Sequence, residues 1–435
     1  MKKILFYSLV AMAALSAASC NKNSNTAEPN VIAGRTARVS ITLHGSTLAE
    51  TKALPVAADE ALVNTVDAFV FNSTGDLDAY GHYVAADFTT TEGVTTLNDD
   101  KKLDCTTGAG KIVYVVINGN NSNLETGEVA FANIATEAQL KARIFKLEDN
   151  KIALGDPATD QLKNFQMIGK TADQTFNAGD NTVNVQVVRD VARVVIKKIT
   201  KNFTSAGLAG DLTIKNIYMS NVVGQYGFGN IVDNDYNFNA SSIAAAQPAA
   251  KWHNKYVPAV ADPATPASVG IESGYNLWLN RALAADVAVA EDASKTTEIE
   301  STFYVMPNDV AWGYDHDSDD QTDDIAGPFG GDSWSARHTK LIIETQYAGT
   351  TYYYVIPIAE NGNGASYVQL GSADDDGSLY RGIKANYSYE IEELELTRLG
   401  STNPDEPTLV ATVNFNITVK PWDVVLLGAD GKYTI

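Results

Sequence analysis

Apolar and polar residues alternate with a period of two along several stretches of the chain, a pattern typical of strands that bury one face. Residues 38–44 (RVSITLH) follow this pattern strictly. Their apolar face consists of Val39, Ile41 and Leu43. Residues 111–118 (KIVYVVIN) are almost entirely apolar, which predicts a central strand that is covered on both faces. Residues 135–147 (ATEAQLKARIFKL) are the best helix candidate in the chain.

Strand patterns continue through the second half of the chain. Residues 182–188 and 191–199 are separated by a short turn at Arg189 and Asp190, which favours a hairpin. We place a domain boundary near residue 200, where a second β-rich region begins. Further strands are expected at residues 65–71, 212–222, 302–306, 340–346, 351–358 and 387–398. The pattern predicts two mainly antiparallel, sandwich-like β domains with few helices.

The first residues have the pattern of an export signal. Lys2 and Lys3 precede a short apolar run at residues 4–18, and small residues lead directly to Cys20. This pattern predicts a lipoprotein in which Cys20 becomes the acylated N-terminus, although a plain signal peptide with an incidental Cys would look similar. Cys105 is then the single remaining Cys, so no disulfide is expected within one molecule. Its neighbours carry no positive charge, which favours a structural role for Cys105 over a nucleophilic one.

The last segment, residues 409–427, is long, extended and apolar on one side. Its apolar face consists of Val413, Phe415, Ile417 and Val419, and Pro421 and Trp422 then interrupt the alternation. From the spacing alone, the favoured interpretation of this segment is the final strand of its own domain.

The other end of the chain suggests a different use for this tail. The strand at 38–44 lies upstream of Lys52, a basic residue in a loop-like stretch, and a trypsin-like cut of the Lys52–Ala53 bond would release that strand. A core that loses an edge strand is left with an apolar groove and unpaired backbone groups. The tail of another copy would fill such a groove by β-strand addition, and head-to-tail addition produces fibres.

Five stretches together resemble the major fimbrial subunits (fimbrillins, FimA-like proteins) of type V pili. They are the leader MKK…SCNKN…AEP, VSITLHGSTLAETKA at 39–53, GKIVYVVINGN at 110–120, RDVARVVIKKI at 189–199, and NYSYEIEELELTRLGSTNPDEP at 386–407 followed by VNFNITVKPW. The matching positions include Arg189, Ala192, Arg193, residues 403–407 and Trp422. The resemblance covers nearly the whole chain, and it rests on the order and spacing of these stretches.

The resemblance implies an outer-membrane lipoprotein precursor that matures by proteolysis into extracellular surface fimbriae. It implies a lipid on Cys20, cleavage between Lys52 and Ala53, and strand donation by residues 409–435. The best-known members are cut after Arg, so cuts after Arg35 or Arg38 stay open as alternatives. The expected fold is mainly β, with two antiparallel β-sandwich-like (transthyretin-like) domains and few short helices. The expected divisions are 1–19 (signal peptide), 20–52 (propeptide), 53–200 (first domain), 201–408 (second domain) and 409–435 (donor tail).

Charge and motifs argue against several other classes of protein. The net charge of −21 argues against nucleic-acid binding, which requires basic patches. Asp315, Asp317 and Asp319 have the alternating spacing of a calcium loop. A solvated acidic loop is favoured there, because Asp320 replaces the usual Gly and Ala326 replaces the usual Glu. No phosphate loop, zinc spacing or nucleophile elbow is present, so no cofactor, no metal and no enzymatic activity are expected.

Three functions remain to be compared: a fimbrial shaft subunit that supports adhesion, a tip, accessory or anchor subunit, and a surface glycan-binding lipoprotein. The long tail and the basic residue at 52 favour the shaft subunit. Glycan binding would use the four tryptophans Trp252, Trp278, Trp312 and Trp334, which have no common spacing and are more typical of a core. The expected partners are other copies of the chain, tip and anchor subunits, the processing protease, and host or bacterial surface receptors. Contact with a membrane is expected only through the lipid of the precursor.

Overall fold

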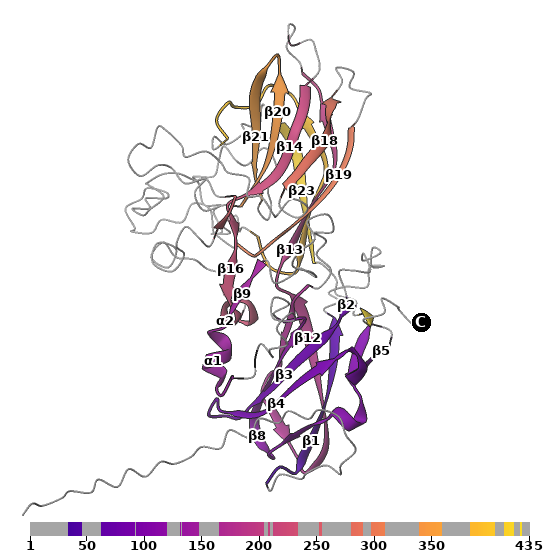
Figure 1. Cartoon of the computed structure of the whole chain (residues 1–435), viewed down its shortest axis with the longest axis vertical. Coiled ribbons are helices and arrows are strands. Elements are labelled where there is room, and N and C mark those ends of the chain that lie inside the picture. Colours follow the sequence, from indigo (N-terminus) through magenta and orange to yellow (C-terminus); the bar gives the residue numbers. More distant parts are fainter. Residues whose placement is uncertain are drawn as a thin grey trace, which may run out of the picture.

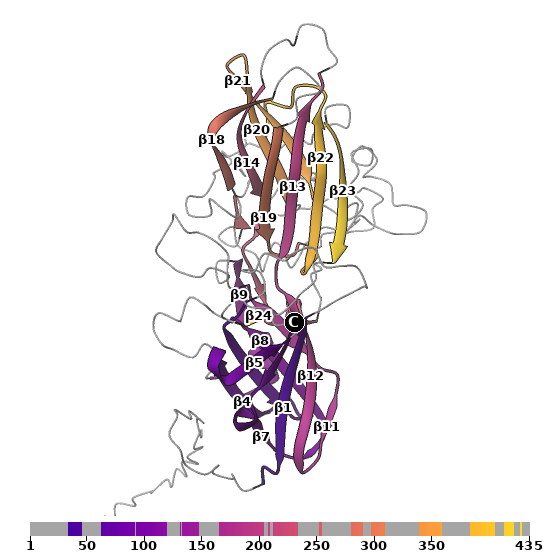
Figure 2. The ribbon, with the colours of Figure 1, turned by 90° about the vertical axis from the view of Figure 1, so that its right-hand side faces the viewer.

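The computed structural model describes fifteen stretches of the chain, which carry nearly all of the strands expected from the sequence. They are residues 34–45, 62–91, 93–119, 131, 133–147, 165–203, 208, 212–233, 252–254, 280–289, 297–308, 339–358, 383–404, 413–421 and 427–428. The described part is mainly β, with several sheets and few short helices. The sheets occupy the two ends of an elongated molecule (Figures 1 and 2).

A ten-stranded sheet forms one end. Its order is β4 (Leu77–Val84), β3 (Thr65–Phe71), β8 (Gly108–Ile117), β10 (Met167–Lys170), β12 (Gly179–Arg189), β1 (Ala37–Gly45), β6 (Val94–Leu97) and β5 (Phe88–Thr91). Off this path, β11 (Gln174–Phe176) pairs with β8 and β7 (Leu103–Cys105) pairs with β1. All ten strands contribute buried side chains to one apolar cluster, so the sheet curls around a common core.

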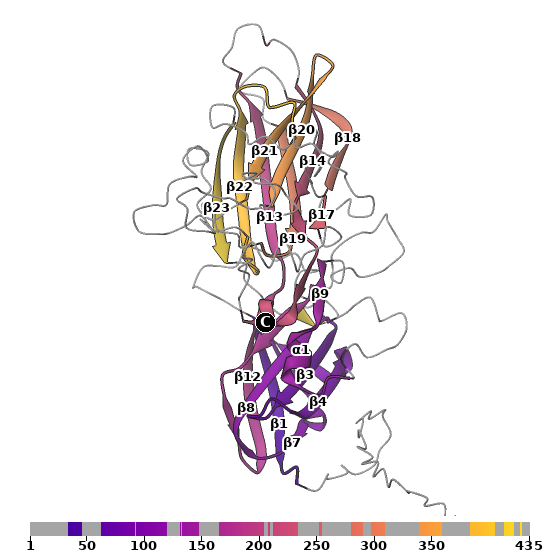
Figure 3. The same ribbon diagram turned by 90° about the vertical axis from the view of Figure 1, so that its left-hand side faces the viewer.

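Two four-stranded sheets form the other end, as Figure 3 shows from a third side. One has the order β19 (Thr297–Val305), β13 (Ala192–Lys201), β22 (Tyr387–Leu396) and β23 (Val413–Pro421). The other has the order β18 (Asn280–Val289), β14 (Leu212–Ser220), β20 (Lys340–Tyr347) and β21 (Thr350–Pro357). Residues of both sheets belong to one large apolar cluster, which also reaches residues of β3 and β8.

Smaller elements lie between and beside these sheets. Three two-stranded pairs are β15 (Val222–Val223) with β17 (Trp252–His253), β16 (Gln225–Gly227) with β9 (Ile144–Lys146), and β2 (Leu62–Val63) with β24 (Leu427–Gly428). The helices are α1 (Glu137–Lys141) and α2 (Phe228–Val232), with 3₁₀ turns η2 (Ala85–Asp87) and η3 (Asp99–Lys101). None of the helices in the described stretches has the length and hydropathy needed to cross a membrane.

The central strand expected at residues 111–118 is confirmed as β8. Val113, Val115 and Ile117 belong to the core of the ten-stranded sheet, whereas Tyr114 and Val116 belong to the large cluster on its other face. Burial of both faces explains why this segment has no polar alternation.

The hairpin expected from residues 182–188 and 191–199 is wrong. β12 pairs with β1 and β10, whereas β13 pairs with β19 and β22, so the chain passes from one sheet to another between these strands. Asn386, whose φ is 60°, holds this passage. Its side-chain oxygen accepts the N–H of Arg189 at 3.2 Å, and its own N–H donates to the carbonyl of Val191 at 2.9 Å.

One further expectation requires correction. The helix expected over residues 135–147 is only α1, which Thr136 caps by accepting the N–H of Gln139. The chain then forms β9, because residues 144–146 pair with β16 instead of continuing the helix. Pairing is mainly antiparallel, as expected, although β1 runs parallel to β12 and β13 runs parallel to β22.

Candidate strand-exchange site

The predicted removable strand is β1, and it lies inside the ten-stranded sheet. It pairs in parallel with β12 from Ala37↔Gly179 to Gly45↔Val187. On its other side, residues 42–44 pair with β6 and residues 37–39 pair with β7, both antiparallel. The expectation of an edge strand is therefore wrong. Removal of β1 would open a slot with unpaired backbone groups on two sides instead of one.

The inward face of β1 is completely buried. Val39 and Ile41 are 0% exposed and Leu43 is 1% exposed, which confirms that these residues share one buried face. They pack in the same cluster as Val183 and Val185 of β12. Because burial of each Val, Ile or Leu side chain contributes roughly 1.5–3 kcal/mol, this face holds β1 strongly in place.

The outward face of β1 is polar, and its charged contacts lie at the N-terminal end of the strand. Arg38 Nη1 lies 3.8 Å from Asp180 Oδ1, and Arg38 Nη2 donates to the carbonyl of Asp99 at 3.3 Å. Lys102 Nζ contacts both carboxylates, at 3.0 Å from Asp180 and 3.1 Å from Asp99. The hydrogen bond from Lys102 holds the pKa of the Asp180 carboxyl below its usual range. Just upstream of β1, Arg35 Nη1 donates to the carbonyl of Asp104 at 3.2 Å.

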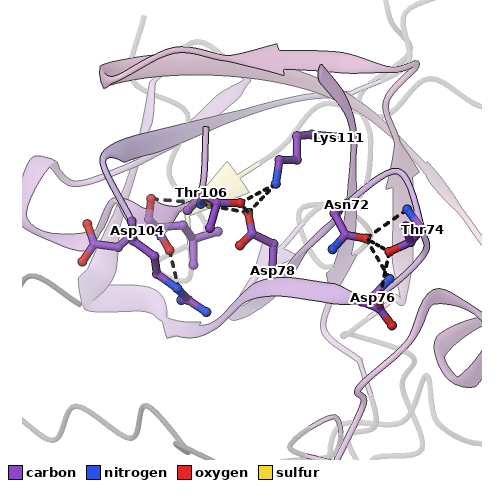
Figure 4. Close-up of polar contacts among 10 residues, drawn as sticks. Asn72, Thr74, Asp76, Asp78, Asp104, Thr106 and Lys111 are labelled. Carbon is purple, nitrogen blue, oxygen red and sulfur yellow. Dashed lines mark hydrogen bonds and ion pairs between the residues drawn. The ribbon is translucent and has the colours of Figure 1, made fainter. Parts of the chain in front are cut away.

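The end of β7 is fixed by a buried ion pair that does not involve β1. Lys111 Nζ of β8 lies 2.8 Å from Asp78 Oδ2 of β4, and both side chains are about 5% exposed or less (Figure 4). Thr106, which follows β7, donates its N–H and its hydroxyl to the same carboxylate oxygen at 3.0 Å. β7 is therefore anchored even without its ladder to β1.

Cys105 lies at this end of β7 and is fully buried. Burial raises the pKa of its thiol to about 12, so the thiolate is not accessible at neutral pH. The structural role expected for Cys105 agrees with this position.

The hairpin of β5 and β6 depends much more on β1. In the described strands, β6 pairs with β1 and β5, whereas β5 pairs with β6. Lys101 Nζ contacts Asp87 Oδ1 at 2.8 Å, which connects η3 to η2 within the same excursion of the chain. β1 is thus the strand that joins this hairpin to β12, because it pairs with β6 on one side and with β12 on the other.

The predicted donor segment is β23, which lies at an edge of its own sheet. It pairs antiparallel with β22, with Ile417 opposite Ile391 and Val413 opposite Leu396. Val413 is 1% exposed and Ile417 is 8% exposed, so both face the large cluster. Phe415 lies between Val413 and Ile417 in the register, opposite Leu394, and Val419 lies beyond Ile417, opposite Tyr389. Further along the tail, Leu427–Gly428 (β24) pairs in parallel with β2, beside the ten-stranded sheet.

Several predicted site residues lie outside the described residues. They are Cys20, Lys52, Ala53, Trp422, the calcium candidates Asp315, Asp317 and Asp319, and the tryptophans Trp278, Trp312 and Trp334. For Trp252 the structure describes the backbone, which pairs with Val223 in β17. The strands that flank β1 are β12, β6 and β7, and the sequence did not identify them as its neighbours. Alternation at 182–188 marked a strand, but no local signal identifies β1 as its partner.

Comparison with known proteins identifies the ten-stranded part of the chain. Residues 37–237 match the model of the major fimbrial subunit protein family (FimA), beginning at the first residue of β1. This region is similar to the FimA major fimbrial subunit family. The predicted resemblance is confirmed, and a family of structural subunits agrees with the expectation that the chain is not an enzyme. A fimbrial family implies a place in cell-surface fimbriae and assembly with other fimbrial subunits.

Solved structures share the fold over most of the chain. A fimbrilin (FimA) from Porphyromonas gingivalis is 17% identical with a TM-score of 0.51, covering 90% of this chain and 99% of its own. A putative cell adhesion protein from Parabacteroides distasonis is 15% identical with a TM-score of 0.52, covering 91% and 99%. Another from Bacteroides eggerthii is 16% identical with a TM-score of 0.50, covering 92% and 99%. None of the curated proteins compared matches the chain.

Proposed function

We propose that this chain is a shaft subunit of a surface fimbria that supports cell adhesion. In this proposal the precursor is exported as an outer-membrane lipoprotein acylated on Cys20. A protease then cuts the Lys52–Ala53 bond, β1 leaves with the propeptide, and the tail at 409–435 of another copy fills the slot. The proposal includes two sandwich-like, transthyretin-like domains between the propeptide and the tail. We divide them between β12 and β13 instead of near residue 200, because β13 pairs with β19 and β22.

The observation that carries the proposal is the placement of β1. It is the first strand of the described chain, it is buried on its apolar face, and it is paired along both edges. Its connection to the next described residue, Leu62, runs through residues 46–61, which include Lys52. A cut in that connection detaches β1 covalently from the sheet that it completes.

The alternative cuts fit this exchange less well. Arg38 lies within β1, with its backbone between those of Asp180 and Asp104, and a protease needs an unpaired extended segment. A cut there would also leave Ile41 and Leu43 in the slot. A cut after Arg35 would leave all of β1 in the chain. Lys52 is the basic residue among these three whose cleavage releases the complete strand.

Apolar burial and a backbone ladder would hold the donor in the slot without a covalent link. Burial of four apolar side chains at alternate positions contributes roughly 6–12 kcal/mol, and the net gain is smaller because Val413 and Ile417 are already buried beside β22 in the described chain. The backbone ladder adds about 1 kcal/mol for each hydrogen bond. Donation from tail to slot is head-to-tail and does not close on itself, so it extends as a fibre.

A processing experiment tests this function. The purified precursor is treated with trypsin or a Lys-specific protease and examined by electron microscopy and heated, non-reducing gels. We expect filaments from the wild type, none from Lys52→Gln, and none from a cut protein that lacks residues 409–435. Arg38→Gln serves as the matched control and should still polymerise. Filaments from Lys52→Gln, or a monomer after a confirmed cut at 52, would contradict the proposal, and filaments capped after one addition would indicate a tip or anchor subunit.

A further inference from the structure

The removable strand and the donor strand share a pattern that can be aligned in two directions. Ile41 is the central inward residue of β1, and Ile417 is the corresponding central residue of β23, with apolar residues two positions away on either side. Alternation keeps the same residues inward in both directions. The direction in which the donor enters must therefore be decided by side-chain size and charge.

Side-chain size favours the reversed direction. If the donor runs opposite to β1, Val419 takes the place of Val39 and Phe415 takes the place of Leu43. The first replacement keeps the volume unchanged, and the second exchanges two large side chains. In the same direction as β1, Phe415 would instead enter the space of Val39 and Val419 would underfill that of Leu43. Since Val39 is 0% exposed in a packed core, the larger ring would have to displace its neighbours.

Charge independently favours the reversed direction. When the propeptide leaves, Arg35 and Arg38 leave with it. The end of the slot then keeps the acidic residues Asp99, Asp104 and Asp180, with Lys102 between Asp99 and Asp180. Reversed entry brings Lys420 to the place of Arg38, opposite Asp180. Entry in the direction of β1 brings the uncharged Asn414 there, so the Asp180 carboxylate keeps its contact with Lys102 but gains no replacement for Arg38.

The end of the donor strand also fits this direction. Reversed entry puts Pro421 at the place of Ala37, which is the terminal residue of β1 and forms its last rungs with Gly179 and Cys105. Proline lacks an N–H and is tolerated at the end of a strand, whereas it disrupts a ladder in the middle. Pro421 therefore marks where the inserted segment ends.

We propose, on the basis of the strand exchange proposed above, that the donor enters the slot antiparallel to β12, with Ile417 at the place of Ile41 and Lys420 beside Asp180. The exchange converts the long parallel ladder of β1 with β12 into an antiparallel one, and it converts the shorter antiparallel ladders of β1 with β6 and β7 into parallel ones. Antiparallel ladders are slightly more stable per residue, and the ladder with β12 is longer than the other two combined, so the net change slightly favours the donor.

Paired cysteines test the direction in filaments of the full chain after processing. Asp180 lies opposite Arg38 and Gln186 lies opposite His44 in the ladder, and both residues are exposed. Four double variants combine Asp180→Cys or Gln186→Cys with Lys420→Cys or Asn414→Cys. We expect disulfide-linked ladders on non-reducing gels from Lys420→Cys with Asp180→Cys and from Asn414→Cys with Gln186→Cys. The other two combinations are matched controls and should stay unlinked.

The outcomes separate this inference from the function on which it rests. Ladders from the two control combinations instead would overturn the antiparallel direction while keeping strand exchange. Filaments without ladders in any combination would show that the donor does not occupy this register, and would overturn the inference as well. A wild-type chain that forms no filaments after cleavage would refute the proposed function itself.

A charge reversal gives a second measurement that does not depend on disulfide geometry. Lys420→Glu in the donor should slow filament growth by roughly threefold to tenfold at low salt, because exposed charge pairs act mainly on association. Asp180→Lys in the accepting molecules should restore most of that rate. An equal rate for Lys420→Glu and wild type, with no response to Asp180→Lys, would refute the charge contact.

Discussion

Ile41→Ala separates the stability of the precursor from that of the filament. Ile41 is 0% exposed in the core of the ten-stranded sheet, at the centre of β1. If β1 is removed on maturation, this substitution acts on the precursor and has no place to act in the filament. If β1 remained in the mature protein, Ile41→Ala would lower the stability of both the precursor and the filament.

The magnitude follows from the burial of this side chain. Truncation of a fully buried Ile to Ala removes its transfer free energy and leaves a cavity, which together cost about 2–5 kcal/mol. Both edges of β1 are paired near Ile41, so its neighbours have little freedom to collapse into the space. We therefore expect the upper half of that range in the uncut precursor, and a change within about 0.5 kcal/mol in the filament.

The assay compares two measurements on the same variants. Urea unfolding of the uncut chain gives the free energy of unfolding of the precursor, and the temperature at which filaments release monomers in detergent gives the stability of the filament. Val185→Ala on β12 is the matched control, because Val185 is equally buried and remains after cleavage. It should weaken both forms, by about 2 kcal/mol in the precursor.

Two results would refute the reasoning. If Ile41→Ala lowered the dissociation temperature of the filament as much as Val185→Ala does, β1 would still be present in the assembled subunit. If Ile41→Ala left the precursor unchanged, β1 would not be packed in the core that the structure describes.

Three further substitutions test the packing around the slot. Lys111→Met leaves the buried Asp78 carboxylate without its cation and should cost about 3–5 kcal/mol in urea unfolding. The hydrogen bond that His82 Nδ1–H donates to the Asp67 carboxylate raises the pKa of His82. Its stabilisation should therefore be complete below pH 6.5 and be lost as the pH rises through the higher folded pKa, and His82→Gln should abolish this difference between unfolding at pH 5.5 and pH 8.5. Asn118→Ala should cost roughly 2–3 kcal/mol in thermal unfolding, because Asn118 has a φ of 53° and four side-chain hydrogen bonds.

The elements that could be predicted are those whose signal is local. Alternation at residues 38–44 identified the buried face of β1, and the apolar run at 111–118 identified a strand buried on both sides. Both predictions depend on which side chains become buried on folding, and the local order of apolar and polar residues determines this. The same reasoning identified Val39, Ile41 and Leu43 as one buried face, and their joint release remains part of the proposed exchange.

The pairing of these elements could not be predicted, because distant residues determine it. β12 and β13 are neighbours in the chain, but Asn386 binds the backbone at both sides of their junction and holds them in different sheets. Likewise, nothing near residue 41 indicates that β12 and β6 flank it. The sequence therefore predicted the strand and its buried face correctly, but placed the strand wrongly at an edge.

The internal position of β1 makes the proposed exchange obligatory in a way that an edge strand would not. Loss of an edge strand opens one ladder and leaves the remaining sheet intact. Loss of β1 opens the ladder of β12 and also detaches the β5–β6 hairpin, whose described pairing to the sheet runs through β1. A cut subunit then exposes apolar core and two rows of unpaired backbone groups at once, each of which costs free energy in water. Only a new strand in the same slot repairs both sides, so in the proposed exchange the loss of β1 would commit the cut subunit to assembly.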